Sequence, residues 1–242
     1  MTTICAHRGA SGYAPENTLE AFELAARQGA HSIELDAHIC KSGEIVVIHD
    51  ETVDRVADGT GTVADMTLSE LKKLNVSRPV PGFGITRIPT LEEVYDLVRT
   101  TNMMVNVELK TGYVDYPDLV EKCVRLAEKM NMRDRVLYSS FNHRSLMEVK
   151  ALDKDLPCGL LYELVMIEPW KYASAYGMNA LHPHLSELRY ADLIPMAHEA
   201  GLEVNPWTVN TQDEMLACIQ AGCERMITNY PDKALQLLNM HK

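Results

Sequence analysis

Residues 33–50 read Ile-Glu-Leu-Asp-Ala-His-Ile-Cys-Lys-Ser-Gly-Glu-Ile-Val-Val-Ile-His-Asp, which predicts two extended segments separated by a turn at 41–44. Glu34 and Asp36 alternate with aliphatic residues, so both carboxylates share one face of the first strand. Such a pair repels unless water, a proton or a cation relieves it, and a hard divalent ion is the simplest remedy. The second segment ends at His49, which places an imidazole beside the two carboxylates.

The composition is that of a globular chain with an acidic balance. The 242 residues fit one large domain, and we interpret 1–242 as a single domain with one core. The formal charge of -11 argues against a nucleic-acid partner, because such binding needs clustered Lys and Arg. It still allows a small anionic substrate, since a metal ion and a few basic groups can reverse the field locally.

No apolar run is long enough to predict a transmembrane segment, and no secretion leader is visible before His7. The six cysteines are scattered without a Cys-x-x-Cys pair, so a zinc site is not expected. Buried free thiols in a reducing compartment are the better interpretation, which predicts a cytoplasmic protein. The sequence leaves a homo-oligomer open.

Strand and helix patterns alternate along most of the chain. Strands are predicted at 3–6, 33–40, 45–48, 103–109, 136–139, 158–161, 179–182, 202–207 and 225–228. With the two early strands counted as consecutive, about eight strand positions are joined by helical crossovers, which favours an α/β (β/α)8 TIM barrel. A doubly wound open sheet is the alternative. No Gly-x-Gly-x-x-Gly or Walker-type loop follows the first strand, so a nucleotide site is not supported.

Two local patterns refine this arrangement. Residues 51–89, rich in Gly and Pro, interrupt the alternation and are interpreted as a small insertion within the domain. Helix starts are marked by capping-box patterns at Thr67, at Thr90, and at Asn17 with Glu20.

Reactive groups of a barrel of this kind lie at the carboxyl ends of its strands. Polar residues collect at those ends in this chain: His7 and Arg8, Glu34 and Asp36, His49, Glu108 and Lys110, His182 and His184, and Trp207. One polar strand end means little, whereas many at successive strands predict a site.

Each of these residues also has a structural interpretation. The three carboxylates could belong to buried ion pairs with Arg8 and Lys110, but two cations leave a deficit that a metal would fill. His7 or His49 alone could be a core histidine. Asp50 is expected to orient His49 or to cap the following turn. On spacing alone, Trp207 fits the core as well as the site, and His38, His182 and His184 stay undecided.

Together these residues resemble the glycerophosphodiester phosphodiesterases. The resemblance covers nearly the whole chain, from 4 to about 232, through motifs in the family's order. These motifs are His7-Arg8-Gly9, Pro15-Glu16-Asn17-Thr18, Glu34-x-Asp36, His49-Asp50, Pro89-Thr90-Leu91-Glu92-Glu93, Glu108-Leu109-Lys110, Ser139-Ser140-Phe141 and Trp207-Thr208-Val209-Asn210. One departure is Asn229, where family members often have Asp, and it bears on fine specificity.

The resemblance implies a (β/α)8 barrel with a small inserted subdomain and one divalent cation, Mg2+ or Ca2+. The positions of its site residues are carried over as follows: Glu34, Asp36 and Glu108 as metal ligands, His7 and His49 as the acid/base pair, and Arg8, Lys110 and Trp207 as substrate contacts. The implied reaction is hydrolysis of an sn-glycero-3-phosphoalcohol to glycerol 3-phosphate and an alcohol.

Several points stay open from the sequence. The nucleophile is either water or the substrate's own glycerol hydroxyl, and neither histidine can be assigned as acid or base. A lysophospholipase D with the same site is the alternative function. A sugar-phosphate isomerase or aldolase and a non-catalytic binding barrel fit three carboxylates with two histidines poorly.

Overall fold

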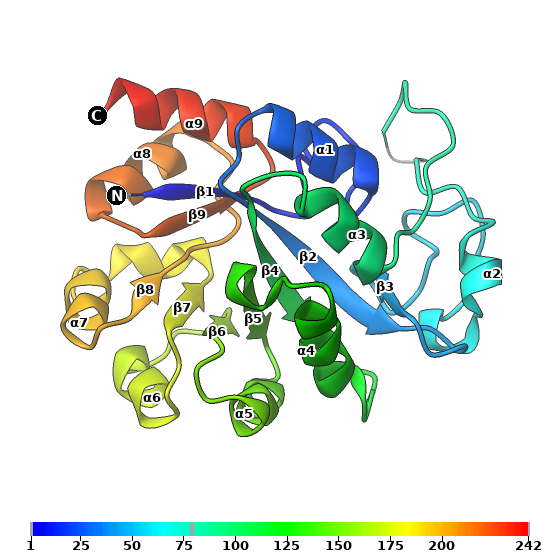
Figure 1. The fold of residues 1–242 in the computed structure, drawn as a ribbon. Helices are drawn as coiled ribbons and strands as arrows, with labels where there is room; N and C mark the ends of the chain where they lie inside the picture. Colours follow the sequence, from blue (N-terminus) through cyan, green and yellow to red (C-terminus); the bar gives the residue numbers. More distant parts are fainter. Residues whose placement is uncertain (1, 78–79, 242) are drawn as a thin grey trace.

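Eight parallel strands form a closed barrel in the computed structural model, which describes residues 2–77 and 80–241 (Figure 1). Its strands are β1 (Thr3–Ala6), β2 (Ser32–Ile39), β4 (Met104–Leu109), β5 (Val136–Ser140), β6 (Cys158–Tyr162), β7 (Ala180–Pro183), β8 (Glu203–Val204) and β9 (Arg225–Thr228). They lie in the order β8-β7-β6-β5-β4-β2-β1-β9. The segment after β8 closes the ring, because the Ile227 N–H donates to the Pro206 carbonyl at 3.1 Å and the Val209 N–H to that of Ile227 at 2.9 Å. The predicted TIM barrel is confirmed, and the open sheet is wrong.

Helices surround the strands (Figure 1). They are α1 (Leu19–Arg27), α3 (Leu91–Val98), α4 (Leu119–Lys129), α5 (His143–Leu152), α6 (Pro169–Ala175), α7 (Leu193–Glu199), α8 (Gln212–Ala221) and α9 (Pro231–Met240). In α4, apolar residues recur at helical spacing and are buried against the sheet, whereas Glu121 and Arg125 face solvent. No helix among the residues that the structure describes is long and apolar enough to cross a membrane.

β3 (Ile45–Val47) corrects one prediction about the early strands. It pairs with β2 antiparallel and lies outside the barrel, so it is not a consecutive barrel strand. Because the chain folds back along β2, the Ile48 N–H donates to the Asp36 carbonyl at 3.1 Å. His49 therefore comes to the carboxylates through a hairpin, and not because it ends a barrel strand.

The described residues of 51–89, which leave out 78 and 79, hold the short helices η1 (Val63–Asp65) and α2 (Leu68–Leu71). They lie to one side of the barrel next to β3 (Figure 1). A second apolar cluster, separate from the main core, combines residues of this segment with Cys40, Val46 and Ile48. This separate cluster supports the proposal that 51–89 is a small subdomain inserted in the single domain 1–242.

Two of the three helix caps predicted from the sequence are present. The capping boxes at Thr67 and Thr90 are confirmed, since each hydroxyl accepts from the N–H three residues on and each glutamate returns the bond. At α1, however, Thr18 is the cap and accepts from the Ala21 N–H. Asn17 lies before it in the left-handed region (φ 56°) and turns its side chain toward β2. The predicted cap at Asn17 is wrong.

The interior of the barrel leaves no room beside His182, which gives a stability prediction. A Cβ at Gly159 would lie 2.4 Å from Nε2 of the fully buried His182 ring. We expect Gly159→Ala to lower the free energy of unfolding by about 1–3 kcal/mol, measured by urea denaturation. Gly84→Ala is the matched control, because a methyl there meets nothing within 4 Å. Equal stability of the two variants would contradict this packing.

Candidate active site

A hollow of about 370 Å³ opens at the carboxyl ends of the strands. It is lined by His7, Arg8, Glu34, His49, Asn106, Glu108, Ser139, Phe141, Leu161, Trp207 and Ile227. Six of the eight predicted site residues are among these, and the other two, Asp36 and Lys110, contact them directly. The structure therefore brings all eight together.

Three carboxylates meet because β2 and β4 are neighbours in register. Asp36 pairs with Glu108 across the two strands, and Glu34 lies two residues before Asp36 on the same face. Each of the three residues places an oxygen within 4.8 Å of the others, and all three are buried. Two adjacent strand ends thus concentrate negative charge in a volume that excludes most water.

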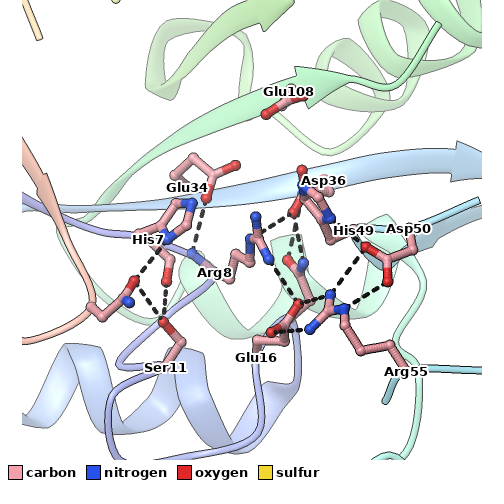
Figure 2. A network of polar contacts seen from close by, with 12 residues as sticks. His7, Arg8, Ser11, Glu16, Glu34, Asp36, His49, Asp50, Arg55 and Glu108 are labelled. Atoms are coloured by element: carbon pink, nitrogen blue, oxygen red, sulfur yellow. Dashed lines mark hydrogen bonds and ion pairs between the residues drawn. The ribbon is translucent and has the colours of Figure 1, made fainter. Parts of the chain in front are cut away.

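Two cations lie against this group, as Figure 2 shows in part. Nε of Arg8 is 3.4 Å from Oδ2 of Asp36, and Nζ of Lys110 is 3.5 Å from its Oδ1. Lys110 also contacts Glu108 at 2.9 Å. The backbone N–H of Arg8, which has a left-handed φ of 55°, donates to Glu34 at 2.9 Å. Buried ion pairs therefore exist, as the structural interpretation expected.

The two cations do not balance the three carboxylates. Burial raises the pKa of Glu34 well above its usual value, and the charges of Asp36 and Glu108 add to this. Burial and Asp36 likewise raise the pKa of Glu108 to about 7. At Asp36 the opposing effect of burial is outweighed by Arg8 and Lys110, which lower its pKa. In the metal-free protein, Glu34 and Glu108 therefore bind protons more readily than ordinary glutamates, which reduces the excess negative charge.

The donor set fits a hard cation. Oδ1 of Asp36 is buried and accepts no hydrogen bond from the residues described. Carboxylate oxygens are the ligands that Mg2+ and Ca2+ prefer, and Glu34 and Glu108 supply two more. An acidic cluster that could bind a metal thus lies at the hollow, which Glu34 and Glu108 line.

The two histidines have different partners. Nδ1 of His7 donates to the amide oxygen of Asn229 at 2.7 Å, whereas Nδ1 of His49 lies 2.6 Å from the carboxylate of Asp50. Burial, with the nearby charge of Arg8 adding to it, lowers the pKa of His7 to about 4. Asp50 contacts His49, which agrees with one of the two roles expected for it from the sequence.

The remaining candidates separate into core and wall. His38 is buried between Tyr116 and the backbone carbonyl of His49, so it supports the hairpin from outside the hollow. His182 lies in the barrel interior. Trp207 is a wall residue that Phe141 contacts edge-on, with ring centroids 5.5 Å apart.

Sequence reasoning assigned no role in the site to the buried Asn17. Nδ2 of Asn17 donates to Oδ2 of Asp36 at 2.8 Å, and its Oδ1 accepts from the Asp36 N–H at 3.4 Å. Its side chain therefore holds the central carboxylate in place. The signal was present in Pro15-Glu16-Asn17-Thr18, but a capping pattern explained the same residues locally.

Comparison with known proteins agrees with this geometry. The model of the glycerophosphoryl diester phosphodiesterase family matches residues 7–233. This chain belongs to that family. A glycerophosphodiester phosphodiesterase of Caldanaerobacter subterraneus is 41% identical over 98% of both chains, and one of Bacillus subtilis is 33% identical over 94% of this chain and 83% of that protein.

Solved structures of the glycerophosphodiester phosphodiesterase family share the fold. A phosphodiesterase from Oleispira antarctica, determined with its product sn-glycerol-3-phosphate, is 28% identical and has a TM-score of 0.91 over 98% of this chain and 96% of that one. The enzyme from Agrobacterium tumefaciens is 27% identical, with a TM-score of 0.86 over 98% and 100% of the two chains. The protein is accordingly a phosphoric diester hydrolase.

The crowded carboxylates predict an unusual pH dependence of stability. The folded-state pKa of Glu108, about 7, exceeds the ordinary value of 4.5, so the native state binds more protons between these pH values. Stability of the metal-free protein should therefore fall as pH rises through this window, and Glu34 contributes in the same direction. In chelator at pH 8 we expect Glu108→Gln to be more stable than wild type by up to about 3 kcal/mol.

Urea denaturation at pH 5 and pH 8 measures this effect. Glu199→Gln, a substitution of an exposed glutamate at the end of α7, is the control and should change stability at neither pH. A gain from Glu108→Gln that is equal at both pH values would contradict the assignment.

Proposed function

We propose that this protein hydrolyses sn-glycero-3-phosphoalcohols to glycerol 3-phosphate and an alcohol, with the help of one divalent cation. The observation that carries the proposal is that three carboxylates, two cations and two histidines meet in or directly against one hollow of a chain of this family. Cleavage of a phosphodiester needs its non-bridging oxygens neutralised, a deprotonated nucleophile and a protonated leaving group. Each need has a candidate group here.

We propose Glu34, Asp36 and Glu108 as the ligands of Mg2+ or Ca2+. The raised pKa of Glu34 and of Glu108 supports this assignment, as does Oδ1 of Asp36, which is buried and accepts no hydrogen bond from the described residues. When bound, such an ion neutralises phosphate oxygens and favours a deprotonated nucleophile. Arg8 and Lys110 would add hydrogen bonds to the same phosphate from the two sides of Asp36.

The hydrogen-bond partners of the histidines support separate roles. Because Nδ1 of His7 donates to an amide oxygen, Nε2 carries the lone pair, and the lowered pKa keeps the ring neutral. We assign His7 as the base that takes the proton of the attacking hydroxyl or water. We assign His49, whose Nδ1 lies against the carboxylate of Asp50, as the acid that protonates the departing alkoxide as the P–O bond breaks.

Aromatic residues of the hollow give the substrate pocket an apolar side. Trp207 and Phe141 form an aromatic wall for the carbon skeleton of the substrate.

A second candidate function is the lysophospholipase D reaction. It is favoured by exposed apolar side chains in the loop after β6, at the same end of the barrel as the hollow. These are Leu164, Val165 and Ile167. All six cysteines are buried and free, which supports the cytoplasm as compartment.

Two substrates with different leaving groups test the histidine roles. Nitrophenolate leaves without a proton, whereas the alkoxide of choline needs one. We expect His7→Ala to lower kcat about 10²–10⁴-fold on both glycerophosphocholine and the p-nitrophenyl ester of glycerol 3-phosphate. His49→Ala should show that loss on glycerophosphocholine only. Equal losses for His49→Ala on both esters would refute its role as acid, and near wild-type rates in either variant would remove that residue from the mechanism.

Metal removal tests the ion. Exhaustive chelation should abolish release of glycerol 3-phosphate from glycerophosphocholine, and added Mg2+ or Ca2+ should restore it. Calorimetric titration of the metal-free protein should show one site, weakened in Glu34→Gln because a ligand charge is lost. Full activity after chelation would exclude the ion from the reaction. The same assay with lysophosphatidylcholine decides between the two candidate activities.

A further inference from the structure

Arg55, in the segment 51–89, makes a double fork between two carboxylates at the edge of the hollow (Figure 2). Its guanidinium donates to Asp50 at 2.6 and 3.1 Å. It also donates to Glu16 at 2.8 and 2.7 Å. All three of its nitrogens are engaged, so the guanidinium plane fixes the two carboxylates relative to each other.

Each of these carboxylates holds a second group that belongs to the site. Asp50 contacts Nδ1 of His49 at 2.6 Å, and Glu16 accepts from Nη1 of Arg8 at 2.9 Å. A continuous series of ion pairs therefore runs from Arg8 through Glu16 and Arg55 to Asp50, and a hydrogen bond continues it to His49. It links the loop after β1 to the loop after β3, two segments that are otherwise not paired as strands.

Stability alone does not account for this arrangement. The side chain of Arg55 is 46% exposed, and exposed ion pairs contribute only about 0–1 kcal/mol. The position of catalytic groups affects the rate much more strongly, because a displacement of about 1 Å in such a group can lower a rate about 10²-fold. A lysine could not replace Arg55, since one ammonium cannot contact both carboxylates as two forks.

We infer that Arg55 is a positioning residue that sets the acid His49 relative to the phosphate-binding Arg8. The inference rests on the proposed roles of those two residues. It assigns to the inserted segment a part in the reaction, although Arg55 itself does not line the hollow.

Kinetics of Arg55→Ala on the two esters described above test the inference. We expect kcat on glycerophosphocholine to fall about 10- to 100-fold, with a smaller loss on the p-nitrophenyl ester, because that ester does not need the acid. Arg55→Lys should recover only part of the rate. Arg87→Ala is the control, since Arg87 lies in the same segment and donates to the Lys73 carbonyl, away from the site.

Double variants separate positioning from simple tethering of the segment. The double variant Asp50→Asn, Glu16→Gln removes both carboxylates that Arg55 contacts. If Arg55 acts through them, adding Arg55→Ala to this double variant should lower kcat on glycerophosphocholine little further. Additive losses, or equal losses of Arg55→Ala on both esters, would overturn the inference. If His49→Ala is inactive on glycerophosphocholine while Arg55→Ala matches Arg87→Ala, only this inference fails. If His49→Ala keeps the wild-type rate on glycerophosphocholine, the proposed role of His49 fails as well.

Discussion

Repulsion among three buried carboxylates is the constraint on which the rest of this site depends. Adjacent parallel strands place Glu34, Asp36 and Glu108 in one small volume, and burial keeps water from screening them. Neighbouring residues relieve part of this charge. Arg8 and Lys110 contribute cations, and the backbone N–H of Arg8 donates a hydrogen bond to Glu34.

Asp36 is the point at which separate segments of the chain converge. Asn17 binds its side chain from the loop before α1, and Ile48 binds its backbone carbonyl from the end of β3. The side chain of Asp36 is fully buried and its pKa is lowered, so it stays ionised in this setting. The same residue thus keeps a negative charge in the acidic cluster and anchors the hairpin that delivers His49.

Local sequence patterns were sufficient to predict the barrel and the eight side chains that the fold brings together at the hollow. Alternation along residues 33–39 identifies the shared face of Glu34 and Asp36, because side-chain direction in a strand depends on spacing alone. Strand-end positions identify His7, Glu108 and Trp207 in the same way. These inferences need no knowledge of how distant segments pair.

Contacts between distant segments could not be read in the same way. An antiparallel β3 and a parallel barrel strand have similar composition, so the hairpin that returns His49 was not distinguishable. Asn17 satisfied a capping rule while its side chain reached 19 residues along the chain to Asp36. The partners of the histidines, Asn229 and Asp50, were noted by position, but the physical difference between them depends on hydrogen bonds that only the fold reveals.

The raised pKa of Glu34 and of Glu108 has a consequence for the stability of the protein in the cell. A ligand that binds only the folded state adds to its stability by mass action, so an ion at these carboxylates would make cellular turnover of the protein sensitive to nutrient supply of divalent cations. Proteases that degrade unfolded proteins would then act first on the protein that lacks the ion.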